Sequence, residues 1–288
     1  MALNFNTLLT RTLTAIIFVA VLMSAITYSY LSFGSLFLVI SLWGLNEFYK
    51  ISVKLGAKPF KLIGYAGGAV VFIASFFQNA DLHLNFKVIY AEGFAILTLA
   101  FFAALFSKNE NPFKDIAYTI AGVFYCVIPF VLLNHISCIS EEIPCDLVYS
   151  YGSNYNPHLI LGLFFLIWAN DTYAYLVGSL IGKRKLYESV SPAKTWEGTV
   201  GAAILTISSS LVIANWFQEL ETMHWMVISF IVVVAGTLGD LTESMLKRQA
   251  GIKDSGRIMP GHGGILDRFD SLMFIAPFVY LFLTIVYS

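Results

Sequence analysis

Charge is the property that this sequence has least of. Only 12% of its 288 residues are charged and the net charge is −1, whereas ordinary soluble domains are about 25% charged. A nearly neutral chain offers no electrostatic basis for binding nucleic acid, and no nucleic-acid partner is expected. Hydrophobic residues make up 58% and aromatic residues 16%, which excludes intrinsic disorder. The composition therefore favours a polytopic protein embedded in the lipid bilayer.

Cysteine is also scarce, and the three cysteines fit no metal-binding spacing. Cys126 falls inside an apolar run and is expected to pack there. Cys138 and Cys145 share one loop, where an oxidising compartment would allow a disulfide. Two free thiols are equally compatible with this spacing, so the pattern leaves the pairing open.

Low-complexity segments and long linkers are lacking as well. We therefore predict a single membrane domain over 1–288. Within it, the helices of 1–150 are expected to form a scaffold and dimerisation region, because this half is nearly featureless apart from its apolar runs. Most polar residues with no evident structural purpose lie in 158–288, which is expected to carry catalysis.

Long apolar runs, by contrast, are abundant. A helical span needs about 20 mostly apolar residues, and continuous runs favour helices over the alternating pattern of barrel strands. We predict an all-α, polytopic transmembrane helical bundle of about nine spans. The runs lie near residues 10–30, 32–49, 60–79, 88–106, 116–136, 158–181, 199–216, 223–243 and 269–287.

The distribution of Lys and Arg predicts the orientation of these spans, since basic residues accumulate on the cytoplasmic side. With the N-terminus inside, every Lys and Arg except Lys87 falls in an inside loop or beside one. The opposite orientation would place almost all of them outside. We expect a multi-pass inner-membrane protein with a cytoplasmic N-terminus and an outside C-terminus.

Two polar segments interrupt the apolar C-terminal half. The first contains Asp171 inside a span, where an ionisable side chain is costly and is expected to face a wet cavity. Further along, Ser191 is expected to cap a helix, where exposed backbone N–H groups beside Lys194 would suit a phosphate. The basic run at 183–185 is equally suited to attracting anionic lipid.

The second polar segment, from Asp240 to Asp270, is denser in charge and glycine. Asp267 and Asp270 are spaced to share one face of a helix, and nearby glycines allow backbone to approach a ligand closely. Carboxylates beside cations are typical of a site where Mg²⁺ meets substrate phosphates that Lys and Arg also bind. The alternative is a salt-bridged loop that ties helices together.

Several familiar signatures are absent. The glycines near Lys183 do not match a P-loop, and those near His262 do not match a dinucleotide-binding loop. HExxH and GxSxG motifs are missing, which argues against zinc hydrolysis and serine acyl transfer. In the N-terminal half, Glu47 and Glu92 lie near span ends and are expected to be interfacial or capped carboxylates.

Most of the second polar segment, in the stretch from Ser244 to Ser271, resembles the signature of phosphatidate cytidylyltransferases, also called CDP-diacylglycerol synthases. The upstream stretch from Asp171 to Gly198 is similar to a second block of that family. Tyr173 and Ala193 depart from the block, standing where a smaller residue and a second lysine are common. The specific resemblance covers roughly residues 165–275. These positions carry it: Asp171-Thr172, Ser191-Pro192, Lys194-Thr195, Glu197-Gly198, Lys247-Arg248, Lys253-Asp254, and His262 to Ser271.

The resemblance implies transfer of a cytidylyl group from CTP to phosphatidic acid, giving CDP-diacylglycerol and diphosphate for phospholipid biosynthesis. It also implies Mg²⁺ as cofactor, with a second cation as an option, and a homodimer. Asp240 and Asp267 become the first candidates for metal ligands and Asp270 the second-tier one. The remaining implied catalytic residues are Lys247, Arg248, Lys253, His262 and Arg268; the implied substrate-binding residues are Asp171, Ser191, Lys194, Thr195, Gly263 and Gly264.

Two other functions are weighed against this one. A related CTP-dependent lipid kinase would add one phosphate and release CDP, so that product mass distinguishes it. A secondary transporter is suggested by Asp171 within a span, but transporters often carry internal repeats. The first half has no counterpart to the polar segments, which argues against a transporter.

Overall fold

The computed structural model describes residues 5–78, 86–139, 155–258 and 263–287, and these residues are almost entirely helical. This confirms the predicted all-α, polytopic membrane fold. The first six helices are α1 (Phe5–Tyr28), α2 (Tyr30–Lys54), α3 (Lys61–Gln78), α4 (Phe86–Leu105), α5 (Pro112–Cys126) and α6 (Ile128–Ile136). The remaining elements are α7 (Pro157–Ile181), strands β1 (Lys185–Tyr187) and β2 (Ser191–Thr195), α8 (Trp196–Trp216), α9 (Thr222–Gln249) and α10 (Leu266–Tyr287).

Each predicted apolar run coincides largely with a helix, except the run 116–136, which two helices share. In the described part of the chain, seven helical segments are long and apolar enough to cross a membrane, and two shorter apolar helices lie at Thr12–Tyr28 and Tyr90–Leu105. The number of crossings and the sides of the termini stay predictions. The long segments are Tyr30–Lys54, Lys61–Gln78, Pro112–Ile136, Pro157–Ile181, Trp196–Trp216, Thr222–Gln249 and Leu266–Tyr287.

Local sequence explains where helices begin and break. Ser29 separates α1 from α2, and its hydroxyl accepts a hydrogen bond from Ser32 N while Ser29 N donates to Ser32 Oγ, both at 3.1 Å. This capping box satisfies N–H groups that a helix start leaves unpaired. The predicted run 116–136 is divided between α5 and α6 at Val127, because Pro129 has no N–H to continue the helical ladder.

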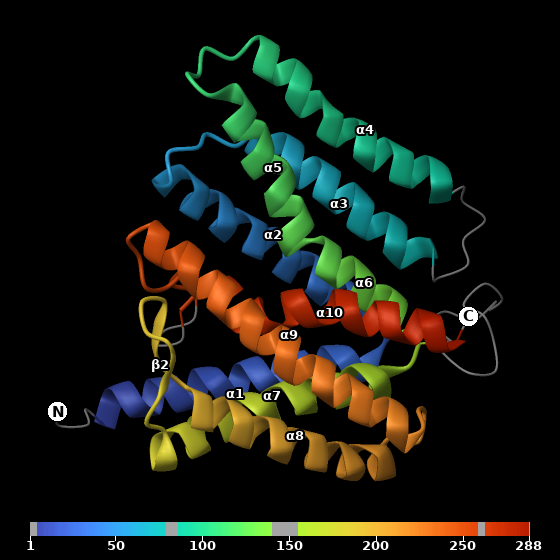
Figure 1. Ribbon diagram of the computed structural model, residues 1–288. Helices are drawn as coiled ribbons and strands as arrows, with labels where there is room; N and C mark the ends of the chain where they lie inside the picture. Colours follow the sequence, from blue (N-terminus) through green and yellow to red (C-terminus); the bar gives the residue numbers. More distant parts are fainter. Residues whose placement is uncertain (1–4, 79–85, 140–154, 259–262, 288) are drawn as a thin grey trace.

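The helices form two groups that meet at α10 (Figure 1). In the N-terminal half, α2 to α6 pack on one another; in the C-terminal half, α7 packs on α8, α8 on α9 and α9 on α10. Helix α10 also contacts α6, α2 and α5, and α1 lies against both α2 and α7. The first turns of α10 therefore lie between the halves.

Aromatic packing holds the start of α10 in place. The buried ring of Phe269 lies 5.6 Å from Phe130 of α6, 6.3 Å from Phe37 of α2 and 5.9 Å from Phe18 of α1, measured between centroids. Close van der Waals packing of this kind drives helix association in lipid, where apolar transfer from water contributes little. Phe269 stands between Arg268 and Asp270, so this packing also positions polar neighbours.

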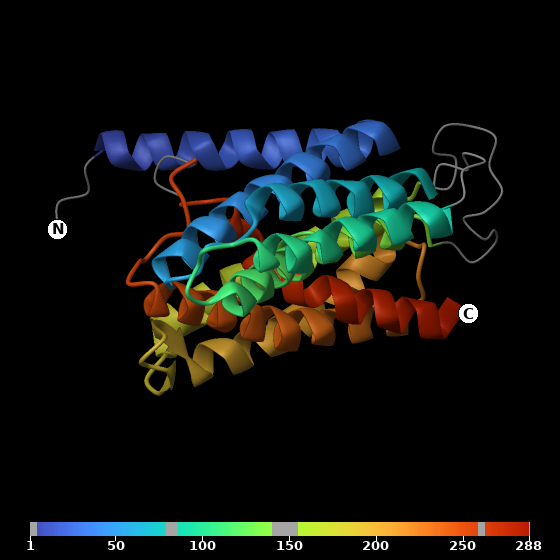
Figure 2. The same ribbon diagram turned by 90° about the horizontal axis from the view of Figure 1, so that it is seen from above.

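The connections that carry basic residues gather at one end of the bundle. Both views show the α2–α3 and α4–α5 connections, the β1–β2 hairpin, the end of α9 and the start of α10 at this end (Figures 1 and 2). Helix α1 also begins there, whereas α10 ends at the opposite end. The arrangement thus brings both polar segments of the C-terminal half to the same end of the molecule.

Candidate functional site

The β1–β2 hairpin leads the first polar segment into the start of α8. Thr195 is the N-cap of α8 and its hydroxyl accepts a hydrogen bond from Gly198 N at 3.2 Å. Ser191 instead begins strand β2, so the expectation that Ser191 caps a helix was wrong. Thr195, four residues later, caps the helix in its place, because a threonine hydroxyl can also accept a hydrogen bond from an unpaired N–H at a helix start.

Glu197 fastens the base of this hairpin. Its carboxylate accepts hydrogen bonds from Lys183 N at 3.0 Å and from Arg184 N at 3.1 Å. Trp196 N also donates to Arg184 O at 2.9 Å. The main-chain donors that follow α7 are thereby joined to the first turn of α8, and the position of Lys194 on β2 depends on this junction.

A polar pocket of about 230 Å³ lies between α7, α8, α9 and β2. Asp171 and Asp240 line it, together with Lys194 and Thr195. Lys194 Nζ forms an ion pair with Asp240 Oδ2 at 2.6 Å. The pocket therefore brings together side chains from both polar segments, which are some 70 residues apart in the case of Asp171 and Asp240.

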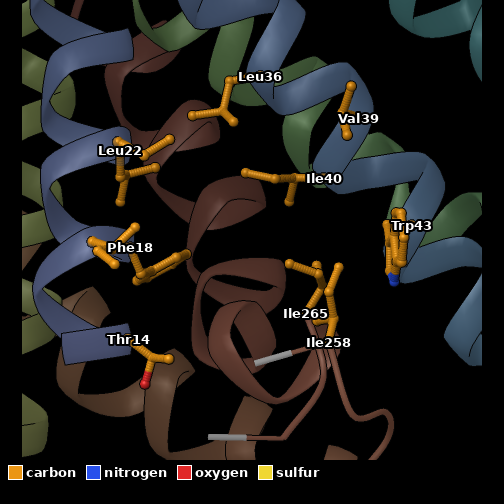
Figure 3. A pocket seen from close by; sticks show the side chains of 11 residues that line it. Thr14, Phe18, Leu22, Leu36, Val39, Ile40, Trp43, Ile258 and Ile265 are labelled. Carbon is orange, nitrogen blue, oxygen red and sulfur yellow. The ribbon is translucent and has the colours of Figure 1, made fainter. Parts of the chain in front are cut away.

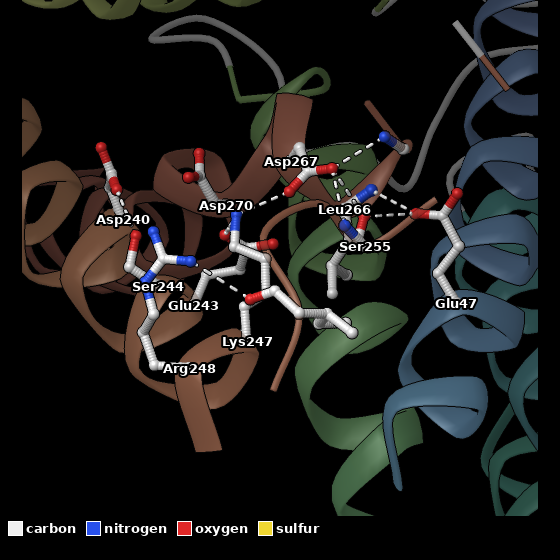
Figure 4. Close-up of polar contacts among 12 residues, drawn as sticks. Glu47, Asp240, Glu243, Ser244, Lys247, Arg248, Ser255, Leu266, Asp267 and Asp270 are labelled. Carbon is white, nitrogen blue, oxygen red and sulfur yellow. Dashed lines mark hydrogen bonds and ion pairs between the residues drawn. The ribbon is translucent and has the colours of Figure 1, made fainter. Parts of the chain in front are cut away.

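A buried ion-pair chain lies beside this pocket, between α9 and α10 (Figure 4). Lys247 Nζ contacts the carboxylate of Glu243 one turn earlier and Asp267 Oδ1 at 2.6 Å. Glu243 is fully buried, and its Oε1 has no hydrogen-bond partner among the described residues. A buried charge is costly unless it is paired. Lys247 therefore stabilises the burial of both Glu243 and Asp267.

Asp267 joins this chain to the loop before α10. Its Oδ2 accepts hydrogen bonds from Gly264 N at 2.7 Å and from Ser255 N and Oγ at 2.9 Å. Gly263 has a φ of 85°, and a Cβ there would lie 2.5 Å from Asp267 Oδ2. A side chain at Gly263 is therefore excluded both by backbone conformation and by the carboxylate.

Glu47 enters the same loop from the N-terminal half. Its Oε2 lies 2.9 Å from Ser255 Oγ and accepts a hydrogen bond from Leu266 N at 2.9 Å. The expectation was an interfacial or a capped carboxylate. The side chain is 2% exposed, so it is not interfacial, and its carboxylate is instead satisfied by hydrogen bonds. The signal that sequence reasoning passed over is an isolated carboxylate inside an apolar run, which is costly unless it has a partner.

Asp270 belongs to the other side of the start of α10. Its Oδ1 accepts a hydrogen bond from Ser271 N at 2.7 Å. Figure 4 shows Asp270 beside Asp240, with Asp267 directed toward Ser255. Asp267 and Asp270, three residues apart on α10, thus belong to two adjacent clusters: Asp267 to the ion-pair chain with Lys247, and Asp270 to the group around Asp240.

The other predicted cations lie at the rim of these clusters. Arg248 is exposed and its Nη1 donates to Ile252 O at 3.2 Å. Lys253 and Arg268 are also exposed. His262 lies outside the described residues, so its expected role stays a prediction.

Carboxylate oxygens at this site have the donor chemistry that Mg²⁺ prefers. Within the described ranges no three or more His, Cys, Asp or Glu side chains converge as a preformed metal cage. Mg²⁺ is usually bound by one or two carboxylates plus substrate phosphates and water, which Asp240 and its neighbours Asp171 and Asp270 can supply together with a ligand. The donor set therefore fits a cation that binds with a phosphorylated substrate.

A second pocket, of about 320 Å³, is apolar and lies between α1, α2 and the loop before α10 (Figure 3). Ile258 and Ile265, on either side of the glycine-rich stretch, line one part of it. Phe18 of α1 and Ile40 and Trp43 of α2 line other parts. The loop that Asp267 anchors thus has an apolar cavity on one side.

A model of the cytidylyltransferase family matches residues 9–286. The chain is 33% identical over 280 residues to a phosphatidate cytidylyltransferase of Staphylococcus haemolyticus, covering 95% of this chain and 98% of that protein. It is 33% identical over 276 residues to one of Staphylococcus aureus, with the same coverage. One of Staphylococcus saprophyticus is 39% identical over 202 residues, 69% of this chain and 70% of that protein.

Proposed function

The chain belongs to the cytidylyltransferase family, and we propose that it transfers CMP from CTP to phosphatidate, giving CDP-diacylglycerol and diphosphate. The observation that carries this proposal is the ion pair between Lys194 and Asp240, which joins the two polar segments at one pocket. Full-length similarity to proteins named for this reaction supports it.

The reaction is a displacement at the α-phosphorus of CTP. An oxygen of the phosphatidate monoester forms the new P–O bond while the bond to the β-phosphate oxygen breaks, and diphosphate leaves with that electron pair. A phosphate monoester is already anionic and needs no general base. Because both reactants are polyanions, positioning and charge neutralisation supply most of the catalysis.

The chain's own cations perform that neutralisation. Lys194 lines the polar pocket. Arg248, Lys253 and Arg268 are exposed on the segments that carry the buried ion pairs, and we assign them to the phosphates of the two substrates. Lys247 is buried between Glu243 and Asp267, so its role is to hold Asp267 in place rather than to contact a substrate. Thr195 holds the start of α8 beside Lys194.

Mg²⁺ would be held by Asp240 with its neighbours Asp171 and Asp270, and Asp267, the other carboxylate at the start of α10, would be a further ligand. When bound, it would neutralise negative charge on the phosphate oxygens of CTP. Asp267 already accepts hydrogen bonds from the loop and pairs with Lys247, so it also orders the segment that presents this set.

The lipid substrate enters from the bilayer, and we place one of its acyl chains in the apolar pocket beside Ile258 and Ile265. Ile17 and Val39, which line this pocket, are exposed apolar side chains, as expected where an acyl chain enters from lipid. The basic connections gather at the same end of the bundle, which supports a cytoplasmic active site. A homodimer is carried over as part of the proposal from the family resemblance.

The test is product analysis with the purified full-length chain. With CTP, Mg²⁺ and phosphatidate in mixed micelles, we expect stoichiometric diphosphate release and a lipid product heavier by CMP. Release of CDP with a lipid heavier by one phosphate would instead establish a kinase. Flux across sealed vesicles without CTP turnover would establish a transporter.

A further inference from the structure

Glu47 is a buried carboxylate of the scaffold half, and among the described residues its hydrogen-bond partners lie in the loop before α10 and at the first residue of α10. It lies 208 residues from Ser255 and 219 residues from Leu266 in the chain. Its Oε2 is 2.9 Å from both Ser255 Oγ and Leu266 N. A carboxylate buried to this extent is costly unless its hydrogen bonds are made, so these contacts strongly favour one position of the loop.

The two groups that Glu47 holds stand directly beside Asp267. Leu266 precedes it in the chain, and Ser255 donates to Asp267 Oδ2 through its backbone N at 2.9 Å. Ser255 Oγ lies 2.9 Å from both carboxylates, but a hydroxyl has one hydrogen and donates to one acceptor at a time. Glu47 and Asp267 are therefore coupled through a single side chain (Figure 4).

Two glycines make this approach of α2 and the loop possible. A Cβ at Gly256 would collide with Glu47 Oε1, and a Cβ at Gly264 would collide with Glu47 Oε2. Gly256 and Gly264 thus lie against the Glu47 carboxylate, as Gly263 lies against Asp267. A residue of the N-terminal half, Glu47, is therefore one reason why glycine is needed at positions 256 and 264.

We propose that Glu47 is a positioning residue for the cytidylyl transfer, which sets the place of Asp267 and of Ser255 through its contacts with Ser255 Oγ and Leu266 N. The inference rests on the proposed function. It extends the site into α2, a helix that otherwise belongs to the scaffold. A shift of about 1 Å at such a position can cost on the order of 100-fold in rate.

The experiment compares Glu47→Ala and Glu47→Gln with wild type in the full-length chain. For Glu47→Ala we expect kcat to fall about 100-fold while KM for CTP changes less than about threefold. Glu47→Gln keeps an acceptor oxygen, so it should recover roughly tenfold of that loss. An unchanged kcat in both variants would refute the positioning role.

Asp115→Asn is the matched control. Asp115 is also buried, at 3% exposure, and accepts hydrogen bonds from Lys58 N at 2.5 Å and Asn109 Nδ2 at 2.7 Å. These partners all lie in the N-terminal half. A merely structural role for Glu47 predicts that both sites lose stability with no change in kcat per folded molecule, which would overturn the proposal.

Ser255→Ala supplies a second arm that does not depend on folding of Glu47→Ala. If Glu47 acts through Ser255, the kcat losses of Glu47→Gln and Ser255→Ala should be non-additive in the double variant. Additive losses would contradict the coupling. Wild-type protein that forms no CDP-diacylglycerol would refute the proposed function, whereas active wild type with fully active Glu47 variants refutes this inference alone.

Discussion

Two carboxylates, one in each half of the chain, occupy similar positions in their helices but have different hydrogen-bond and ion-pair partners. Asp115 lies in the first turn of α5 and Asp267 in the first turn of α10. Asp115 pairs with the backbone of Lys58 and the amide of Asn109, both neutral. Asp267 pairs with the charged Lys247 and with a loop that is itself held by Glu47.

The difference shows that burial of a carboxylate does not by itself mark a functional site. In the N-terminal half, buried polar groups join neighbouring helices: Asn134 Nδ2 donates to Ser75 Oγ at 2.8 Å, and Tyr49 Oη donates to Thr119 O at 2.8 Å. In the C-terminal half, charges of both signs converge on a pocket. A concentration of paired charge beside a cavity is what distinguishes the second region.

The largest expected effect is that of Asp267→Asn. Loss of this charge leaves Lys247 with Glu243 alone and weakens the acceptor for three loop donors, so we expect kcat to fall by about 10³-fold or more. Folding should persist, because asparagine retains one acceptor oxygen. Diphosphate release and size-exclusion profiles measure the two properties. Activity close to wild type would contradict the placement of Asp267 at the site.

Chelation of divalent cations is expected to be comparably severe. EDTA should reduce activity to background, and added Mg²⁺ should restore it, because carboxylates with substrate phosphates complete the coordination shell. Binding of Mg²⁺ in the presence of CTP can also be followed calorimetrically. Titration heat that is unaltered by Asp240→Asn would remove Asp240 from the metal site.

Lys194→Ala is expected to have an intermediate effect. It removes the cation from the polar pocket and leaves Asp240 without its ion-pair partner, so kcat/KM should fall about 100-fold. Lys185→Ala, on strand β1 of the same hairpin, is the control and should cost less than about threefold, since Lys185 is exposed. Equal losses in both variants would favour general attraction of anionic lipid over a specific contact.

Ile40→Trp tests the apolar pocket and should have a smaller effect. The larger side chain fills part of the cavity between α1 and α2, so KM for long-chain phosphatidate should rise about tenfold with kcat nearly unchanged. Short-chain phosphatidate should be affected less. The same shift for both lipids would show that the pocket does not hold an acyl chain.

Asp115→Asn should have the smallest effect on catalysis. Weaker hydrogen bonds to Lys58 N should lower the free energy of unfolding by about 1–2 kcal/mol. The kcat per folded molecule should match wild type. Thermal unfolding monitored beside activity separates the two, and a large loss of kcat would erase the contrast between Asp115 and Asp267.

Much of the fold was predictable because it depends on local pattern. The apolar runs coincide largely with helices, since lipid requires every backbone group to be paired within its own segment. The division of the run 116–136 into α5 and α6 was not predicted, although Pro129 explains it. The cap of α8 was misassigned to Ser191 because several hydroxyls compete near one helix start, and the backbone path of the β1–β2 hairpin decides among them.

Much of the site was also predictable in its composition. The two polar segments do meet, through Lys194 and Asp240. The partition of nearby carboxylates between the two clusters was not predictable from the spacing of Asp267 and Asp270, because a shared helix face does not specify which neighbours surround it. Placing Glu47 in the site required the contact between α2 and the loop before α10.

The amino-acid sequence by itself determined the all-α membrane architecture and the family, because hydrophobic run length and motif spacing are properties of short segments. The tertiary structure decided which charges pair. It placed Lys247 between Glu243 and Asp267, and it brought Glu47 across more than 200 residues to Ser255. Electrostatic partners are chosen by distances of a few ångströms, and such distances between remote segments exist only after the helices have packed.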